Sequence, residues 1–437
     1  ELIREAFISE LQPDLVHVFS ALEGYEDNVV TSLARLNTDY PVTATFYDLI
    51  PLLNPEEYLG TNHAFKHHYS ERIDNLKRAD GLLAISHFSA GEAAEHLHFP
   101  REKISVASLG PLGPSIAERV ARGGDIAALR AIDVAPEFLL YVGGSDPRKN
   151  LPRLVEAWSS LPPDLQREHQ LVMAGSMPRQ DVATLKKIAS EKAAYPHALV
   201  FTGQVSDQLL AQLYRQCSAF VFPSWHEGFG LPALEAMAVG AAVVAANACS
   251  LPEVVGLDEA LFDPFDVGDV SAKLQKVLTD TAFRQRLRAH APHQAAKFSW
   301  QETANRALAF FDETLGRSEQ IRVNQVAKRS EEDWHADYPE RLQGLLTLLA
   351  AEIKTEPSRA RRRALTSQVA AAIDRNEQHI LRRRLRGGFD ISPWLIEGPF
   401  DTSYSLALLN RELARGLSAA NIEVRLHSTE GPGDFDP

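Results

Sequence analysis

The chain has 437 residues and a hydrophobic content of 45%, which suffices for two or three domains with apolar cores. Its net charge of −13 disfavours a nucleic-acid-binding protein, because such proteins are more often basic. The two cysteines, Cys217 and Cys249, show no paired spacing, so the sequence disfavours a disulfide scaffold and a zinc site and indicates a reducing, cytoplasmic compartment.

Residues 1–113 alternate between strand and helix patterns, which predicts a parallel α/β sheet. Strands are expected at residues 14–19, 42–47, 81–85 and 104–107, and helices at 2–11, 28–36, 65–78 and 90–97. Ser86 is the predicted cap of the last of these helices. Tyr47 and Asp48 follow a strand, where open α/β sheets bind their ligands, and the alternative is that Asp48 caps the following turn.

A second α/β pattern fills residues 114–316, after a crossing rich in Gly and Pro. Its expected strands are residues 138–142, 170–174, 199–202, 219–222 and 242–246. Helical segments separate these strands, so the pattern predicts a doubly wound nucleotide-binding domain.

The first strand of this domain ends in Gly143 and Gly144, and Arg148 and Lys149 follow. Two adjacent cations after a glycine-rich turn suit a pyrophosphate, whose charge grows as a glycosidic bond breaks. The alternative is an ordinary solvated turn. Gly203 ends a later strand, near the position expected for a nucleotide base, although this signal is weak.

The most informative stretch runs from residue 219 to 238 and predicts a strand, a glycine-rich turn and a helix. Gly228 and Gly230 allow a tight turn and the close approach of a ligand. The free N–H groups at the helix start can bind a diphosphate, and the carboxylates of Glu227 and Glu235 flank that position. The alternative is a structural turn in which Glu235 complements the helix dipole.

The same stretch resembles the signature of retaining glycosyltransferases of family four, in which seven residues separate two glutamates. That family adopts the GT-B fold, so the resemblance implies two Rossmann-like, doubly wound domains that face a cleft. It implies that Glu227 lies near the donor sugar hydroxyls and Glu235 on the donor ribose. It further implies contacts of the donor sugar and phosphates with the backbone of Phe229, Gly230 and Leu231 and with the side chains of Arg148 and Lys149.

The first domain carries a second resemblance. Tyr47-Asp48-Leu49-Ile50-Pro51 is similar to a His-Asp-Leu-Ile-Pro segment that faces the sugar or acceptor, with Tyr47 in place of the His. The segment after Ser86 is similar to a serine-rich strand end that lines the cleft, although Ser86 also fits a plain helix cap. The acceptor is therefore expected to enter from this domain.

The family implies transfer of a hexose from a nucleoside-diphosphate sugar to a hydroxyl of a glycan or lipid-linked acceptor, with no metal ion and no separate cofactor. Analogy with bacterial polysaccharide mannosyl- and rhamnosyltransferases favours mannose and GDP-mannose. One alternative is a nucleotide-sugar-binding or scaffold module without turnover. Another is a GT-B phosphorylase or epimerase, although no lysine is identified that would carry pyridoxal phosphate.

Residues 317–387 predict a helical linker, in which two runs of three arginines fit a solvated helix face. Residues 388–437 predict a strand, a helix and a strand that resemble the opening of another family-four module. The chain is therefore expected to be a piece of a tandem transferase, whose other parts could contact the inner membrane surface. The alternative is that residues 388–437 complete the first domain.

Overall fold

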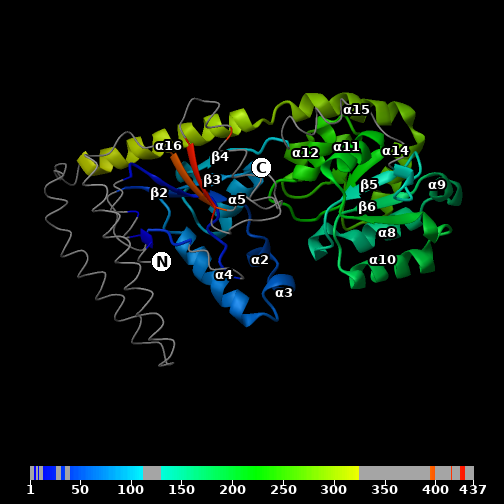
Figure 1. The fold of residues 1–437 in the computed structure, drawn as a ribbon, viewed down its shortest axis with the longest axis horizontal. Helices are drawn as coiled ribbons and strands as arrows, with labels where there is room; N and C mark the ends of the chain where they lie inside the picture. Colours follow the sequence, from blue (N-terminus) through cyan, green and yellow to red (C-terminus); the bar gives the residue numbers. More distant parts are fainter. Residues whose placement is uncertain are drawn as a thin grey trace.

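The computed structural model describes residues 13–25, 31–34, 40–111, 129–323, 394–398 and 424–428, together with residues 4, 5, 8 and 415. In this part of the chain the strands form three parallel sheets, of four, six and two strands (Figure 1). None of the described helices combines the length and the apolar character that a membrane crossing requires.

The first sheet has the strand order β1-β2-β3-β4. Its strands are β1 (Val16–Val18), β2 (Val42–Phe46), β3 (Gly81–Ala84) and β4 (Ile104–Val106), and all four were predicted. The helices that the structure describes in full here are α2 (Ile50–Leu53), α3 (Pro55–Tyr58), α4 (His63–Leu76), α5 (His87–His96) and the 3-10 turn Arg101–Lys103. Residues 4, 5 and 8 are also helical, within the predicted helix 2–11. Every residue of β2 and β3 is buried, as expected for parallel strands covered on both faces.

Two local predictions in the first domain have opposite outcomes. Ser86 caps α5, because its hydroxyl accepts a hydrogen bond from the backbone N–H of Ser89 at 2.9 Å. The predicted helix over residues 28–36 is wrong where the structure describes it, since residues 31–34 are not helical. There the Thr31 hydroxyl donates to the Ala21 carbonyl at 3.1 Å and Ala34 has a φ of 45°, so tertiary contacts override the helical pattern.

The second sheet has the order β10-β9-β8-β5-β6-β7. Its strands are β5 (Leu139–Val142), β6 (Leu171–Ala174), β7 (Leu199–Gly203), β8 (Ala219–Phe222), β9 (Val243–Ala246) and β10 (Leu261–Phe262). The chain runs outward from β5 to β7 and then returns to β8 beside β5, which confirms the predicted doubly wound sheet. Its switch point, where such sheets bind ligands, lies between β5 and β8. The two-residue strand β10 was not predicted because it is too short to give a pattern.

Helices cover both faces of this sheet (Figure 1). They are α8 (Leu151–Ser159), α9 (Pro163–Glu168), α10 (Arg179–Lys192), α11 (Asp207–Gln216), α12 (Leu231–Ala238), α13 (Leu251–Val255), α14 (Val267–Thr279) and α15 (Thr281–Ala295). Short 3-10 turns occur at η2 (Pro147–Lys149), Pro196–Ala198 and Asp258–Ala260.

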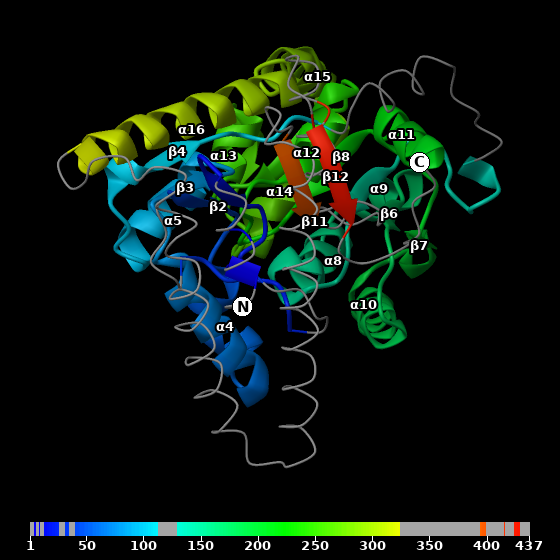
Figure 2. The ribbon, with the colours of Figure 1, turned by 60° about the vertical axis from the view of Figure 1, so that its left-hand side comes forward.

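Helix α16 (Trp300–Val323) follows the second domain in sequence but packs on the first. Phe310 and Phe311 form a buried cluster with Leu83 and Ala107, and Figure 2 shows α16 running beside β3 and β4. The indole nitrogen of Trp300 donates to the carbonyl of Pro111 at 2.8 Å. The chain passes from the first domain to the second after Pro111 and returns at Trp300, so this hydrogen bond joins the two interdomain connections.

The strands β11 (Trp394–Gly398) and β12 (Val424–Ser428) confirm the two strands predicted in this region. They pair in parallel, with Trp394 opposite Val424, and within the described residues neither strand extends the first sheet. Residues 324–387 of the predicted linker and residues 388–393 of the following unit lie outside the described residues, as does the helix predicted over 403–417 except for residue 415.

Candidate active site

The turn after β5 is held rigidly against the loop after β8. The Asp146 carboxylate accepts the backbone N–H of Arg148 at 3.1 Å, which caps the η2 turn. Asn150 has a left-handed φ of 60°, and its amide donates to the carbonyls of Pro223 at 3.2 Å and Pro264 at 2.7 Å. Arg148 and Lys149 therefore leave a fixed turn at the switch point of the sheet.

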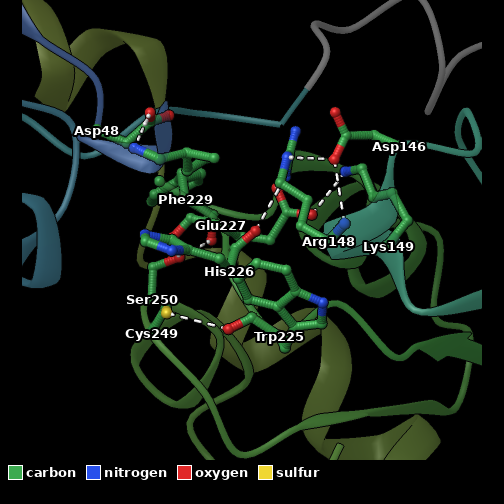
Figure 3. Close-up of polar contacts among 12 residues, drawn as sticks. Asp48, Asp146, Arg148, Lys149, Trp225, His226, Glu227, Phe229, Cys249 and Ser250 are labelled. Atoms are coloured by element: carbon green, nitrogen blue, oxygen red, sulfur yellow. Dashed lines mark hydrogen bonds and ion pairs between the residues drawn. The ribbon is translucent and has the colours of Figure 1, made fainter. Parts of the chain in front are cut away.

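Arg148 and Lys149 both bind Glu227 (Figure 3). Arg148 Nη1 lies 2.7 Å from Glu227 Oε2, and Lys149 Nζ lies 2.6 Å from Glu227 Oε1. The side chains of Arg148, Lys149 and Glu227 are only 20%, 13% and 9% exposed, so the solvated-turn alternative is wrong. Arg148 Nε also lies 3.5 Å from Oδ1 of Asp146, so the two cations face two carboxylates in a largely dry site.

The two cations control the protonation of Glu227. Burial alone would raise the pKa of Glu227, but the Lys149 and Arg148 charges outweigh it and lower this pKa to about 2. Burial lowers the pKa of Lys149, and the Glu227 carboxylate opposes that shift. Glu227 is therefore a fixed carboxylate at neutral pH.

The glycine-rich loop after Glu227 lies against the first domain. A Cβ on Gly228 would lie 2.8 Å from the carbonyl oxygen of Tyr47 and 3.0 Å from Oδ2 of Asp48, so a side chain here would push the domains apart. The Ser250 hydroxyl lies 2.9 Å from the Glu227 carbonyl and 2.8 Å from that of Phe229, which pins the loop from below. Gly230 has a φ of 105° and precedes Leu231, the first residue of α12.

Glu235 is buried in α12 and has a different partner. The Tyr214 hydroxyl donates to Glu235 Oε2 at 3.0 Å, so this carboxylate has a specific contact beyond the helix dipole. Burial raises the pKa of Glu235 to about 7, because the bond from Tyr214 offsets the desolvation only in part.

Three glycines end the neighbouring strands β5, β6 and β7. Gly143, Gly175 and Gly203 all have positive φ, and a Cβ on Gly175 would collide with the carbonyl of Gly143. The Gly144 carbonyl accepts the Tyr141 hydroxyl at 2.7 Å. Gly143 and Gly144 lie in the turn between β5 and Arg148. Gly203 lies beside Gly175, whose backbone N–H donates to the Gly203 carbonyl at 3.0 Å.

The predicted residues of the first domain meet at Gly228. The Ser86 hydroxyl lies 2.7 Å from the Gly228 carbonyl and Ser89 Oγ lies 3.0 Å from it, while Ser89 Oγ also lies 2.6 Å from the Tyr47 carbonyl. Asp48 Oδ1 accepts the backbone N–H of Ile50 at 3.1 Å, so the capping alternative is confirmed. Burial raises the pKa of Asp48.

Several residues that join the two domains were not predicted from the sequence. His226 lies 2.8 Å from Glu92 and 3.1 Å from Asn54, and Tyr58 donates to Asp146 at 2.5 Å. Glu253 lies in the first turn of α13. Its oxygens accept backbone N–H groups of the first domain, that of His87 at 3.2 Å and that of Phe88 at 3.5 Å. In sequence, His226 is 134 residues from Glu92 and 172 residues from Asn54. A local sequence pattern cannot predict contacts over such separations.

Comparison with known proteins assigns both domains. Residues 127–294 match the family described as glycosyl transferases group 1, and residues 2–110 match glycosyltransferase family 4. The O-antigen chain mannosyltransferase B of Escherichia coli is 30% identical over 265 residues, which cover 60% of this chain and 68% of that protein. The chain belongs to the glycosyltransferases.

A second relative and a solved structure give two further comparisons. The serotype-specific mannosyltransferase WbdA of Escherichia coli is 37% identical over 324 residues, or 74% of this chain, and the chain spans about 40% of the length of that relative. The sucrose-phosphate synthase of Thermosynechococcus elongatus superposes with a TM-score of 0.53 at 22% identity, covering 72% of this chain and 77% of the other. The predicted GT-B fold is confirmed.

Proposed function

We propose that this glycosyltransferase is a retaining mannosyltransferase of cell-surface polysaccharide synthesis. Its donor would be a nucleoside-diphosphate sugar, with GDP-mannose favoured, and its acceptor a hydroxyl of a glycan or lipid-linked glycan. The observation that carries the proposal is the buried Arg148–Glu227–Lys149 cluster at the switch point of the second sheet. The mannosyltransferase names of its relatives support the choice of sugar.

The donor diphosphate would bind to Arg148, Lys149 and the free N–H groups at the start of α12. Both cations are largely withdrawn from water, so their attraction for an anion is stronger than at the surface. As the bond between the sugar C1 and the phosphate oxygen breaks, its electron pair passes to the diphosphate. The two cations would stabilise that growing charge.

Retention of configuration would follow from attack on the face that the diphosphate leaves. The acceptor oxygen forms the new bond to C1, and its proton passes to the departing phosphate oxygen. Glu227, held ionised by its two cations, would accept hydrogen bonds from the donor sugar hydroxyls. Glu235 would accept those of the ribose. The proposed setting is the cytoplasmic side of the inner membrane, with any membrane contact made by other parts of a longer protein.

The first test is thermal stabilisation by GDP, UDP, dTDP and ADP and by the common sugar nucleotide of each. We expect a selective shift with GDP and GDP-mannose that Lys149→Ala abolishes. Lys192→Ala is the matched control, because Lys192 binds Glu156 at 2.8 Å on the surface of the same domain. Incubation with glycan acceptors and NMR of the product would then show whether the new linkage keeps the donor's anomeric configuration.

Two results would contradict the proposal. A shift with another nucleotide alone would reject GDP-mannose as donor. Nucleotide binding with no transfer to any mannose-containing acceptor would favour the binding-module alternative.

A further inference from the structure

His226 connects the two domains through both of its ring nitrogens. Its Nε2 lies 2.8 Å from Oε1 of Glu92 on α5, and its Nδ1 lies 3.1 Å from Nδ2 of Asn54, between α2 and α3. The His226 and Glu92 side chains are 7% and 3% exposed. The contact is therefore dry and spans the domain interface one residue before Glu227.

Hydrogen-bond chemistry fixes the direction of this contact. An amide nitrogen can only donate, so Nδ1 of His226 accepts from Asn54 and the ring proton lies on Nε2, which donates to Glu92. Asn54 Nδ2 also donates to the Ile50 carbonyl at 2.9 Å, and Glu92 Oε2 accepts the backbone N–H of Leu49 at 3.3 Å. Both partners of His226 are thus tied to the backbone that directly follows Asp48.

The backbone around His226 leads to the catalytic charges. Its carbonyl accepts Arg148 Nη1 at 3.0 Å, and this same nitrogen lies 2.7 Å from Glu227 Oε2. The preceding residue, Trp225, donates its backbone N–H to the Arg148 carbonyl at 2.9 Å. The first domain therefore holds the His226 ring. The His226 backbone holds the guanidinium that faces Glu227 (Figure 3).

We propose that Glu92 and Asn54 are positioning residues that act through His226. They hold Arg148 and Glu227 in their reactive arrangement when the acceptor-side domain is docked on the donor-side domain. This inference rests on the proposed function for the roles of Arg148 and Glu227. Loss of Glu92 leaves a buried ring N–H without its acceptor, which is more costly than the loss of an exposed partner. The Ser86 and Ser89 contacts with Gly228 remain, so the variant keeps other cross-domain contacts.

The test compares Glu92→Ala, His226→Ala and the double variant in steady-state kinetics and in calorimetric titration with GDP. We expect each single variant to lower kcat about 10- to 100-fold, because small displacements of catalytic groups have effects of that size. We expect the GDP dissociation constant to change less than about threefold, and the double variant to be no slower than the slower single variant. Glu92→Gln, which keeps one acceptor for His226, should restore part of kcat.

His17→Gln is the matched control. His17 is half-buried, with its ring nitrogens 2.8 Å and 2.9 Å from the hydroxyls of Thr43 and Thr45, but these partners belong to its own domain. We expect this variant to lose thermal stability and keep its kcat. A kcat for Glu92→Ala within twofold of the parent would overturn the proposal, as would equal losses of kcat and GDP affinity.

Small-angle X-ray scattering separates this proposal from the proposed function. The radius of gyration with GDP bound should be larger for Glu92→Ala than for the parent, and unchanged for His17→Gln. This readout needs no turnover, so a parent that transfers no sugar would contradict the proposed function while the docking contact is still tested. Equal radii for parent and Glu92→Ala would overturn the docking contact.

Discussion

Glu227 and Glu235 stand at the two ends of one motif and are equally buried, each 7% exposed over the whole residue, yet their pKa values move in opposite directions. Glu227 lies between two cations and has a pKa of about 2, whereas Glu235 has only a phenol as partner and a pKa of about 7. Burial is the same in both cases, so the charge of the partner decides protonation. One end of the donor site is permanently ionised and the other titrates near neutral pH.

The largest expected effect comes from removing one of the charged side chains around Glu227. Lys149→Ala or Glu227→Ala should lower turnover by about 100- to 1000-fold, because each removes a preorganised charge from the reacting diphosphate or sugar. In Lys149→Ala the pKa of Glu227 should also rise, since one of its two cations is gone. Steady-state kinetics measure the first effect. Turnover within a few-fold of the parent would reject these catalytic assignments, with Lys192→Ala as the surface control.

The raised pKa of Glu235 should make the stability of the protein depend on pH. Because folding raises the pKa of Glu235 from 4.5 to about 7, the parent loses stability as pH rises through this window, by about 3 kcal/mol in total. Glu235→Gln cannot titrate, so its stability relative to the parent should rise by that amount between pH 4.5 and pH 8. Urea unfolding at both pH values measures the difference.

For Glu227→Gln we expect a pH dependence of stability opposite in sign to that of Glu235→Gln. The lowered pKa of Glu227 stabilises the fold above pH 4.5, and this contribution is lost as pH falls toward 2. The variant should therefore be less stable than the parent at neutral pH, and the deficit should shrink on acidification. If both glutamine variants changed stability equally at every pH, the contrast between the two carboxylates would be wrong.

The smallest effect is expected from Tyr214→Phe. Removing the hydroxyl deletes a hydrogen bond to ionised Glu235, so the pKa of Glu235 should rise further and stability at pH 8 should fall by about 1 kcal/mol. Below pH 4.5 the cost should be smaller, because the protonated carboxyl needs the bond less. Tyr25→Phe, which loses a surface bond to Asn62 of 3.0 Å, should show no such pH dependence.

The strands and the second domain's topology could be predicted because parallel strands are short apolar runs with regular spacing. The charged motif residues could be predicted because Arg148, Lys149, Glu227 and Glu235 stand at fixed offsets from strand ends. The opposite pKa shifts of Glu227 and Glu235 could not be predicted, because Tyr214, the partner of Glu235, lies on another helix. The helix predicted over 28–36 failed for a related reason, because Thr31 bonds to a distant carbonyl.

The residues that join the domains carried no local signal at all. Asn54, Glu92 and Glu253 are ordinary turn and helix residues in sequence, and each acquires its role from a partner in the other domain. The family resemblance covers the donor motif better than these contacts, because the motif is contiguous and the interface is not.

The return of α16 to the first domain imposes an order on synthesis. Leu83 and Ala107 are buried by Phe310 and Phe311, which leave the ribosome about 200 residues later. At about 5–20 residues per second, the first domain waits roughly 10–40 s for the helix that closes its sheet. During that interval the second domain can fold, while the side of the first sheet that α16 covers stays exposed. The domain made first is therefore the domain finished last.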